Sequence, residues 1–308
     1  MKHLLTLMEF KPHEVEDLLR ISRDFKARYM AGEVYTPLFP GRIVMLYFEK
    51  PSTRTRLSLT AAAAQLGMQA VYTAPGELQI GRGETIADTM RVVSRYAAAV
   101  AARVYKHETL EEMARYSSIP VINALSDRHH PLQALADALT LWERSGRLHG
   151  LKVAFVGDVS NNVATSLAVV GAKLGWEVRL VGPKPLWNQK LVEELAEDLA
   201  KTGGQIYFTD SMNEVAGVDG VYTDVWVSMG FEKEAEERRR LLKPYQVNQR
   251  VMDIAGKRAV FLHCLPAHRG EEVTDEVIDG PQSAVWDQAE NRMHTAKAVF
   301  AYLLNKRA

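Results

Sequence analysis

The chain contains 308 residues, of which 47% are hydrophobic and 25% are charged. This is the composition of an ordinary globular protein, and it excludes a disordered or fibrous chain. Because 38 basic residues balance 38 acidic ones, the net charge is zero and the chain shows neither a nucleic-acid-binding excess of charge nor an acidic tail. At roughly 150 residues per domain, the length predicts two domains.

Three short features exclude further classes of protein. The apolar stretch at residues 96–102 is far shorter than the ~20 residues that span a bilayer. The apolar segment at residues 4–8 is too short for a signal-peptide core. A single cysteine, Cys264, excludes an internal disulfide and every metal site that needs several cysteines. We therefore expect a cytoplasmic protein that binds neither membrane nor nucleic acid.

The first half of the chain alternates between strand and helix patterns. A helix is predicted to begin near Pro12, with apolar residues at helical spacing as far as Phe25. Short apolar runs predict strands at residues 42–48, 69–73, 98–105 and 120–124. Helical patterns pass through residues 57–66, 85–96, 108–116 and 131–144. This alternation is typical of a parallel sheet covered by helices on both faces.

After a predicted linker at residues 145–150, the alternation resumes. Strands are predicted at residues 151–156, 177–181, 205–208, 220–223 and 259–264, and helices at residues 163–174, 191–202 and 285–304. We therefore expect the α/β class, with two doubly wound parallel-sheet domains and an active site in the cleft between them. The expected domains are residues 1–145 and 146–286, with a C-terminal helix at 287–308 that packs back on the first domain.

Hydroxyl and guanidinium groups follow the first predicted strand, in the run Ser52-Thr53-Arg54-Thr55-Arg56. The positive end of the helix that follows attracts phosphate, and Arg54 can bind phosphate oxygens with a bidentate fork. A helix cap with two solvated arginines is the plainer interpretation. Five such residues in succession favour an anion site, and the lack of a Gly-rich run excludes a Walker loop.

A second corner, His129-His130-Pro131-Leu132-Gln133, also lies between a predicted strand and a helix. His130 and Gln133 share one face of the first helical turn, where they suit a carbonyl oxygen and an amide NH₂ group. A capping histidine with a surface glutamine is the alternative interpretation. Metal binding is not expected, because no second ligand lies at the required spacing and His129 points to another side.

Polar residues also follow the strands of the second half. The corner at residues 157–162 lacks the glycines of a dinucleotide site, and its Asn161-Asn162 pair suits a helix cap or a zwitterion. Asp224 and Ser228, in the loop after residues 220–223, suit an ammonium group. A lone buried cysteine ordinarily serves as a small apolar packing residue, but the position of Cys264 at the end of a strand favours a functional role. Strand alternation predicts that His263 projects to the opposite face from Cys264.

Taken together, these motifs resemble the carbamoyltransferase family, in order from about residue 48 to residue 292. Residues 52–56 are similar to its carbamoyl phosphate signature, and His130-Pro131-x-Gln133 to its second signature. Asp224-x-x-x-Ser228-Met229-Gly230 and His263-Cys264-Leu265-Pro266 resemble the pair of motifs found in members that use ornithine. The resemblance implies carbamoyl transfer from carbamoyl phosphate to the δ-amine of L-ornithine, giving L-citrulline and phosphate in arginine metabolism, without a metal or an organic cofactor.

The resemblance also implies roles for individual residues. Carbamoyl phosphate would be bound by Ser52, Thr53, Arg54, Thr55, Gln79, Arg103, His130, Gln133, Cys264, Leu265 and Arg292. Ornithine would be bound by Asn162, Asp224, Ser228 and Met229. The catalytic residues would be Arg54, Arg103, His130, Asp224 and Cys264. Gln79 matches the position from which the family reaches into a neighbouring subunit's site, so a homotrimer or a multiple of trimers is expected.

Two alternative functions remain open at the level of sequence. One is a carbamoyltransferase for another amine such as putrescine, and the other is a non-catalytic α/β protein that binds an anion. A dehydrogenase that uses NAD is the least favoured, because the glycines are missing. Cys264 is expected to favour the neutral form of the ornithine amine, and a covalent carbamoyl-cysteine is the alternative.

Overall fold

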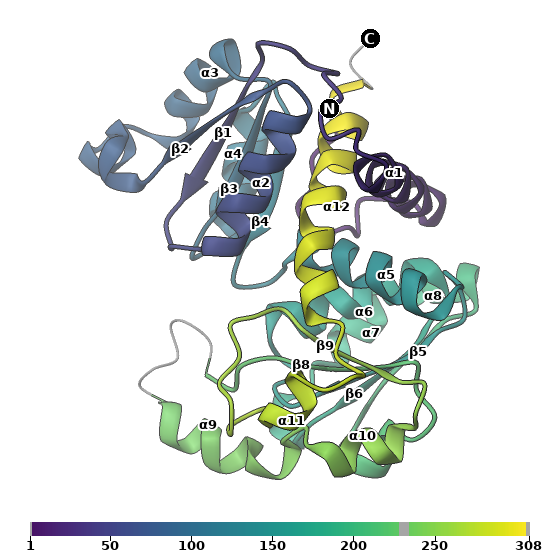
Figure 1. Ribbon diagram of the computed structural model, residues 1–308. Coiled ribbons are helices and arrows are strands. Elements are labelled where there is room, and N and C mark those ends of the chain that lie inside the picture. The colour runs from purple at the N-terminus through teal and green to yellow at the C-terminus, as the bar shows by residue number, and fades with distance from the viewer. Residues whose placement is uncertain (1, 228–233, 306–308) are drawn as a thin grey trace. The chain divides into compact units, whose positions relative to one another are not determined.

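A computed structural model of the chain describes residues 2–227 and 234–305. It divides into two compact units (Figure 1): unit 1 comprises Met1–Ala136 and Glu290–Ala308, and unit 2 comprises Asp137–Ala289. The boundaries fall inside two helices, α5 (Pro131–Ser145) and α12 (Val285–Asn305), so each of these helices contributes residues to both units. No described helix is long and apolar enough to cross a bilayer.

Unit 1 is built on a four-stranded parallel sheet with the order β2-β1-β3-β4. Its strands are β1 (Ile43–Phe48), β2 (Gln69–Thr73), β3 (Ala99–Arg103) and β4 (Val121–Leu125). Its other elements are α1 (Pro12–Met30), α2 (Thr53–Gln65), α3 (Ile86–Tyr96), α4 (His107–Tyr116), η1 (Pro75–Glu77) and η2 (Gln79–Arg82). The chain crosses from β1 outward to β2 and then returns to β3 on the other side of β1. The topological switch point therefore lies between β1 and β3, where a doubly wound sheet binds its ligand.

Unit 2 contains a five-stranded parallel sheet with the order β7-β6-β5-β8-β9. Its strands are β5 (Lys152–Val156), β6 (Glu177–Val181), β7 (Gln205–Thr209), β8 (Gly220–Thr223) and β9 (Val260–His263). Its helices are α6 (Asn162–Leu174), α7 (Gln189–Glu194), α8 (Ala196–Thr202), α9 (Ala235–Leu242), α10 (Gln249–Ala255) and α11 (Asp275–Ile278), with 3-10 turns η3 (Lys184–Leu186), η4 (Met212–Val215) and η6 (Lys243–Tyr245). The switch point lies between β5 and β8. The predicted α/β class with two parallel sheets is confirmed.

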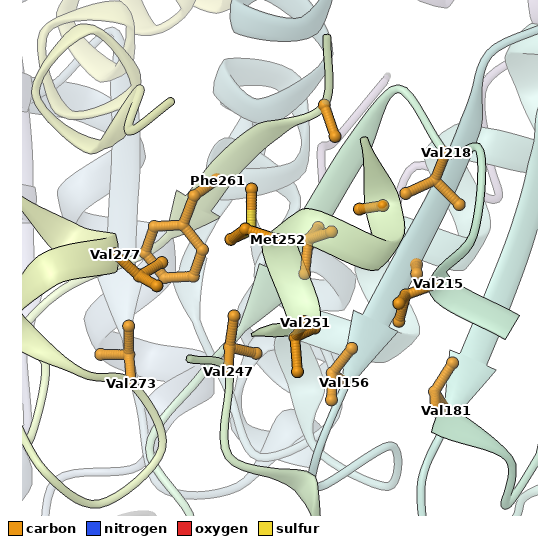
Figure 2. Close-up of a cluster of buried hydrophobic side chains, with 14 of the residues drawn as sticks. Val156, Val181, Val215, Val218, Val247, Val251, Met252, Phe261, Val273 and Val277 are labelled. Atoms are coloured by element: carbon orange, nitrogen blue, oxygen red, sulfur yellow. The ribbon is translucent and has the colours of Figure 1, made fainter. Parts of the chain in front are cut away.

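Apolar side chains from strands and helices meet in a buried core on one face of the unit 2 sheet. Figure 2 shows Val251 and Met252 of α10 packed in the same cluster as Val156 of β5 and Phe261 of β9. The inner strands β5 and β8 are buried on both faces, which explains why they read as continuous apolar runs rather than as alternating ones. This rigid core fixes the positions of the loops at the carboxyl ends of the strands.

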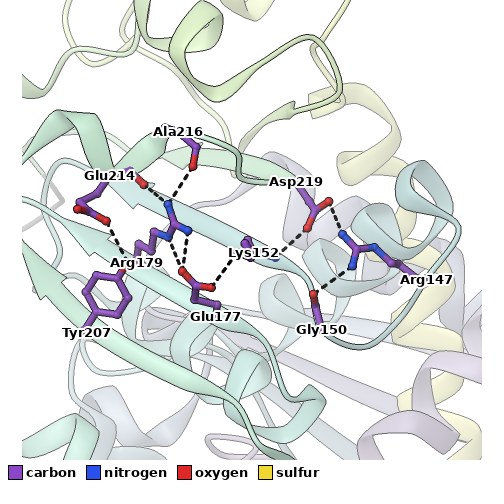
Figure 3. A network of polar contacts seen from close by, with 9 residues as sticks. All are labelled: Arg147, Gly150, Lys152, Glu177, Arg179, Tyr207, Glu214, Ala216 and Asp219. Carbon is purple, nitrogen blue, oxygen red and sulfur yellow. Dashed lines mark hydrogen bonds and ion pairs between the residues drawn. The ribbon is translucent and has the colours of Figure 1, made fainter.

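Charged residues near the amino ends of the unit 2 strands form hydrogen bonds and ion pairs with one another and with nearby carbonyl oxygens (Figure 3). Arg147, in the predicted linker, donates to Asp219 at 2.6 Å and to the carbonyl oxygen of Gly150 at 3.2 Å. Arg179 donates to Glu177 at 2.7 Å and to two carbonyl oxygens that follow β7. This network holds loops in place, whereas the loops beyond the carboxyl ends carry the candidate site.

Several predicted elements differ from the structure in their bounds, among them the following three. The helix predicted at residues 191–202 is two helices, because the backbone at Leu195 departs from helical geometry with a ψ of −1°. The strand predicted at 98–105 ends at Arg103, and the one predicted at 259–264 ends at His263. In both cases the apolar run continues into the loop beyond the last strand pairing, so hydrophobicity alone overestimates the length of the strand.

A lysine of α12 is buried in unit 1, with only 2% of its surface exposed. The Lys297 ammonium donates to Gln65 at 2.9 Å and lies 5.3 Å and 5.4 Å from the ring centroids of Phe25 and Tyr29. Burial lowers the pKa of Lys297 from 10.5 to about 8. The unfolded chain therefore binds more protons between these two pH values, and the free energy of unfolding rises as the pH increases through that window.

Replacing this lysine by methionine is expected to stabilise the protein at pH 7. Lys297→Met removes the buried charge, so the free energy of unfolding should rise by ~1–3 kcal/mol at pH 7 and by progressively less as the pH approaches 10. Denaturant unfolding at several pH values measures the effect. The control is Lys190→Met, since 79% of the Lys190 side chain is exposed. A destabilisation by Lys297→Met that is equal at all pH values would contradict the prediction.

Candidate active site

The first cluster of polar residues lies at the start of α2, directly beyond the carboxyl end of β1. Ser52 is the N-cap of this helix, and its Oγ accepts a hydrogen bond from the backbone N–H of Thr55 at 3.3 Å. No acidic residue occupies the first turn, so the positive end of the helix is not neutralised locally. The predicted capping role therefore applies to Ser52. It leaves the other early N–H groups of the helix available to an anion.

The two arginines of this turn have different surroundings. The guanidinium of Arg56 lies 3.8 Å from the ring centroid of Tyr72 on β2, which engages it in a cation–π contact. Arg54 is half-buried and has no carboxylate partner among the described residues. Of the two, Arg54 is the arginine that can turn toward a phosphate.

A second set of unit 1 residues joins α2, α5 and α12. Arg292 of α12 donates to Gln133 Oε1 at 2.5 Å and to Thr55 Oγ1 at 3.0 Å. All three side chains are buried, and both acceptors are uncharged. The sequence separation of Arg292 from Thr55 is 237 residues. The structure thus brings together three residues that the sequence assigned to carbamoyl phosphate.

Buried cationic groups surround His130, which precedes α5. Burial holds the pKa of His130 well below its ordinary value, and the charges of Arg292 and Arg103 lower it further. Arg103 ends β3, beside the switch point, and is itself 8% exposed. His130 is therefore a neutral imidazole close to two guanidinium groups. Such a group can donate a hydrogen bond to a carbonyl oxygen without adding charge.

A carboxylate is the centre of the polar cluster in unit 2. Asp224 follows β8, on the opposite side of the switch point from the loop after β5, and is 7% exposed. The thiol of Cys264 donates to Asp224 Oδ1 at 3.0 Å, and Asn161 Nδ2 donates to Oδ2 at 3.2 Å. Burial raises the pKa of Asp224, and nearby His263 and the hydrogen bond from Cys264 act in the other direction. A buried carboxylate held by neutral donors is suited to an ammonium group.

The prediction that His263 projects away from Cys264 is wrong. A carboxylate oxygen of Asp224, a ring nitrogen of His263 and the sulfur of Cys264 all lie within 4.8 Å of one another. Because β9 ends at His263, the alternation of side chains does not continue to Cys264. His263 is held in place by two contacts: its Nδ1 accepts from the N–H of Leu265 at 2.9 Å, and its Nε2 lies 3.1 Å from Glu272 Oε1.

Two groups of side chains among the described residues have the composition of a metal site. In the group of Asp224, His263 and Cys264, both ring nitrogens of the histidine already have partners within unit 2. In the group of His268, Glu271 and Glu272, Arg239 donates to both carboxylate oxygens of Glu271, at 3.1 and 3.2 Å. Neither group is therefore free to bind a cation without breaking contacts that hold the loops.

The remaining predicted residues lie in several places. Gln79 begins the 3-10 turn η2 and is exposed, as is Thr53 at the start of α2. Asn162 is the first residue of α6, where its carbonyl oxygen accepts from Ser166. Leu265 has a left-handed φ of 58°, which is strained for leucine. Ser228 and Met229 lie outside the described residues.

The sequence did not identify several polar residues of this region as partners. Asn161 caps α6, which was one of the two interpretations offered for it, but its contact with Asp224 was not predicted, and neither was the contact by which Glu272 fixes the ring of His263. The indole N–H of Trp226 is buried and, within the described part of the chain, has no hydrogen-bond partner. Its position two residues after Asp224 in a loop of the site was the available signal. The contact of Glu272 depends on tertiary structure, and no signal in the sequence indicated it.

Two family models match the chain. The carbamoyl-P binding domain of aspartate/ornithine carbamoyltransferase matches residues 2–143, and the Asp/Orn binding domain matches residues 149–303. An ornithine carbamoyltransferase of Pyrobaculum islandicum is 88% identical over 304 residues, which are 99% of this chain and 100% of the relative. The solved ornithine carbamoyltransferase of Pyrococcus furiosus is 47% identical with a TM-score of 0.94, covering 99% of this chain and 97% of that one. The structure from Thermus thermophilus is 42% identical with a TM-score of 0.88 and covers 99% of both chains.

Proposed function

This chain belongs to the aspartate/ornithine carbamoyltransferase family, and we propose that it transfers the carbamoyl group of carbamoyl phosphate to the δ-amino group of L-ornithine. The products are L-citrulline and phosphate, as in arginine biosynthesis. The observation that carries the proposal is the buried group in unit 1, where Arg292 contacts Thr55 and Gln133 and lies close to the neutral imidazole of His130. Such a group suits a small, planar, polar substrate next to an anion.

Unit 1 supplies the residues for carbamoyl phosphate. Ser52, Thr53, Arg54 and Thr55 at the positive end of α2 bind the phosphate, and Arg54 adds a bidentate contact. Arg103, Thr55 and His130 donate to the carbamoyl oxygen. Gln133 and Arg292, which contact each other, orient the carbamoyl group. The backbone carbonyl oxygens of Cys264 and Leu265 accept hydrogen bonds from its NH₂ group.

The reaction follows from these roles without further groups. The neutral δ-amine attacks the carbamoyl carbon, and Arg103, Thr55 and His130 stabilise the negative charge that develops on the carbamoyl oxygen. The intermediate then collapses as the bond between the carbamoyl carbon and the phosphate oxygen breaks. Phosphate leaves with the electron pair, stabilised by Arg54 and the helix end, and accepts the proton released by the amine.

Unit 2 supplies the residues for the amino acid. Asp224, held by Asn161 and Cys264, binds the ammonium group of ornithine. Asn162, Ser228 and Met229 complete the proposed contacts to the amino-acid end. This set favours an α-amino acid over a simple diamine, because a diamine has no carboxylate to bind to the polar loops.

Steady-state kinetics with a panel of amines tests the proposal. The purified protein is given carbamoyl phosphate with ornithine, putrescine or aspartate, and citrulline is measured by its colour reaction alongside phosphate release. We expect turnover with ornithine and a kcat/KM lower by at least ~100-fold for putrescine, since the hydrogen bonds to the α-carboxylate are lost. Preferred use of putrescine would identify another acceptor. Binding of carbamoyl phosphate without turnover of any amine would identify a non-catalytic protein.

The expected trimer rests on Gln79, which we propose to enter the site of a neighbouring subunit in the cytoplasmic enzyme. Gln79→Ala should lose activity by ~10-fold, the cost of one hydrogen bond to the substrate. When this variant is mixed with Arg54→Ala under conditions of subunit exchange, hybrid oligomers contain some sites with both native residues. Activity of the mixture should therefore exceed the weighted average of the two variants. If exchange is demonstrated and activity stays at that average, each site is built from one chain.

A further inference from the structure

Two buried histidine rings lie beside the loop that leads to His130. His107 is the first residue of α4 and is 3% exposed, and His129, directly before His130, is 8% exposed. Their ring centroids are 5.4 Å apart with an interplanar angle of 60°, an edge-to-face contact. The proposed reaction uses neither ring, although they adjoin one of its central residues.

The hydroxyl of Ser126 connects the two histidines. Its Oγ lies 2.8 Å from Nδ1 of His107 and accepts from the backbone N–H of His129 at 3.2 Å. The carbonyl oxygen of His129 in turn accepts from the N–H of Ser126 at 3.0 Å and from Asn123 Nδ2 at 3.2 Å. These bonds close the turn of residues 126–129 and fix the backbone from which His130 projects.

A second contact ties the same turn to α4. The carboxylate of Asp127 accepts from the backbone N–H of His107 at 2.8 Å. The first residue of α4 therefore holds the turn through its backbone and through its ring. The position of His130 thus depends on two elements, the end of β4 and the start of α4.

Both rings are held in their neutral form. Nδ1 of His129 is buried and has no hydrogen-bond partner among the described residues. Burial, the nearby His107 and Arg128 lower the pKa of His129 to about 4, and burial lowers that of His107 as well. The other charged or titratable groups near the pair are Lys106, Glu108, Glu111, Asp127 and Arg128.

Protonation would change the connections of the turn. A neutral His107 can accept the Ser126 hydroxyl proton at Nδ1, whereas a protonated ring must donate to that oxygen. The hydroxyl proton would then turn to the carbonyl oxygen of His129, which lies 3.4 Å away rather than 2.8 Å. A second proton would place two like charges on rings in direct contact, which is unfavourable in a buried site.

We propose that His107 and His129 together position His130, and that uptake of a proton by this pair loosens the turn and weakens the use of carbamoyl phosphate in acid. The proposal rests on the function proposed above for His130. His107 and His129 are positioning residues, because they act through the backbone of the turn rather than on the substrate. The pair thereby gives the enzyme an acid limit that is separate from the titration of the ornithine amine.

The pH dependence of His129→Phe and of His107→Gln tests this role, because each variant removes one of the two rings that can take up a proton, and phenylalanine at 129 keeps the ring contact. We measure kcat/KM for carbamoyl phosphate at saturating ornithine from pH 4 to pH 8.5 and compare variant with wild type at each pH, so that titration of the substrates cancels. The ratio of variant to wild type should rise about 2-fold between pH 8 and pH 4, where a group with a pKa of about 4 is half protonated. The exposed His13 on α1 provides the control His13→Gln, which should give a constant ratio. A constant ratio for His129→Phe would overturn the proposal.

A second measurement does not depend on activity. Hydrogen–deuterium exchange of peptides covering residues 120–135, corrected for the intrinsic effect of pH, should become faster in wild type between pH 8 and pH 4 but not in His129→Phe or His107→Gln. Equal acceleration in all three proteins would overturn the proposal. If wild type makes no citrulline, the proposed function fails, while the exchange measurement still decides whether the pair controls the turn.

Discussion

Replacement of Arg54 by alanine is expected to lower kcat by ~10²–10⁴ while the protein remains folded, because a charge-assisted bidentate contact worth ~3–5 kcal/mol in the transition state is lost. The loss should be large because the charge on the phosphate increases as the bond to the carbamoyl carbon breaks. Arg54 is half-buried and makes no salt bridge among the described residues, so its removal leaves no carboxylate unpaired. Steady-state kinetics of the purified variant measures the effect.

Arg56 provides the matched control, because it lies on the same helical turn. Its guanidinium packs against the Tyr72 ring at 3.8 Å, so Arg56→Ala should affect stability by no more than ~1 kcal/mol and activity by less than about 10-fold. Circular dichroism and oligomeric state establish that both variants are folded. A folded Arg54→Ala protein with nearly full activity would exclude the proposed phosphate site.

Several regular elements of the fold were predictable because the inner strands of the sheets are buried on both faces. The strands at residues 177–181 and 220–223 have the predicted bounds, and so does the partly exposed edge strand at residues 69–73. The α9, α10 and α11 helices were not predicted. They contain eight, seven and four residues, too few for a helical period to stand out, and α9 is mostly charged.

The sequence also indicated which loops carry polar groups, because parallel strands place their ligands beyond their carboxyl ends. It could not indicate how those groups are paired. Arg292 reaches Thr55 across 237 residues, and Glu272 reaches His263 only because a loop returns after β9. The wrong placement of His263 has the same origin: strand alternation ceases at the residue where the strand ends, and that residue was not known from the pattern.

Replacement of Asp224 by asparagine is expected to lower kcat/KM for ornithine by ~10²–10³, corresponding to ~3–4 kcal/mol for the loss of one partner of a buried charge pair. Asparagine has nearly the same shape and can still form hydrogen bonds with Asn161 and Cys264. The decrease in kcat/KM therefore measures the contribution of the negative charge. Burial raises the pKa of Asp224. In wild type, kcat/KM for ornithine should therefore fall in acid partly because this carboxyl takes up a proton, and that contribution should be absent in the variant.

Cys264→Ser separates the charge of Asp224 from the thiol that donates to it at 3.0 Å. If the thiol helps to select the neutral amine, the serine variant should use ornithine less well by ~10-fold, with a pH profile shifted to the alkaline side and turnover still measurable. At pH 7 only about one amine in 10³ is neutral, because an alkyl amine of this kind has a pKa near ~10.4. kcat/KM for ornithine should thus rise with pH in both proteins. Complete loss of turnover in Cys264→Ser, together with a carbamoyl adduct on the wild-type thiol in mass spectrometry, would show that the reaction passes through a covalent intermediate.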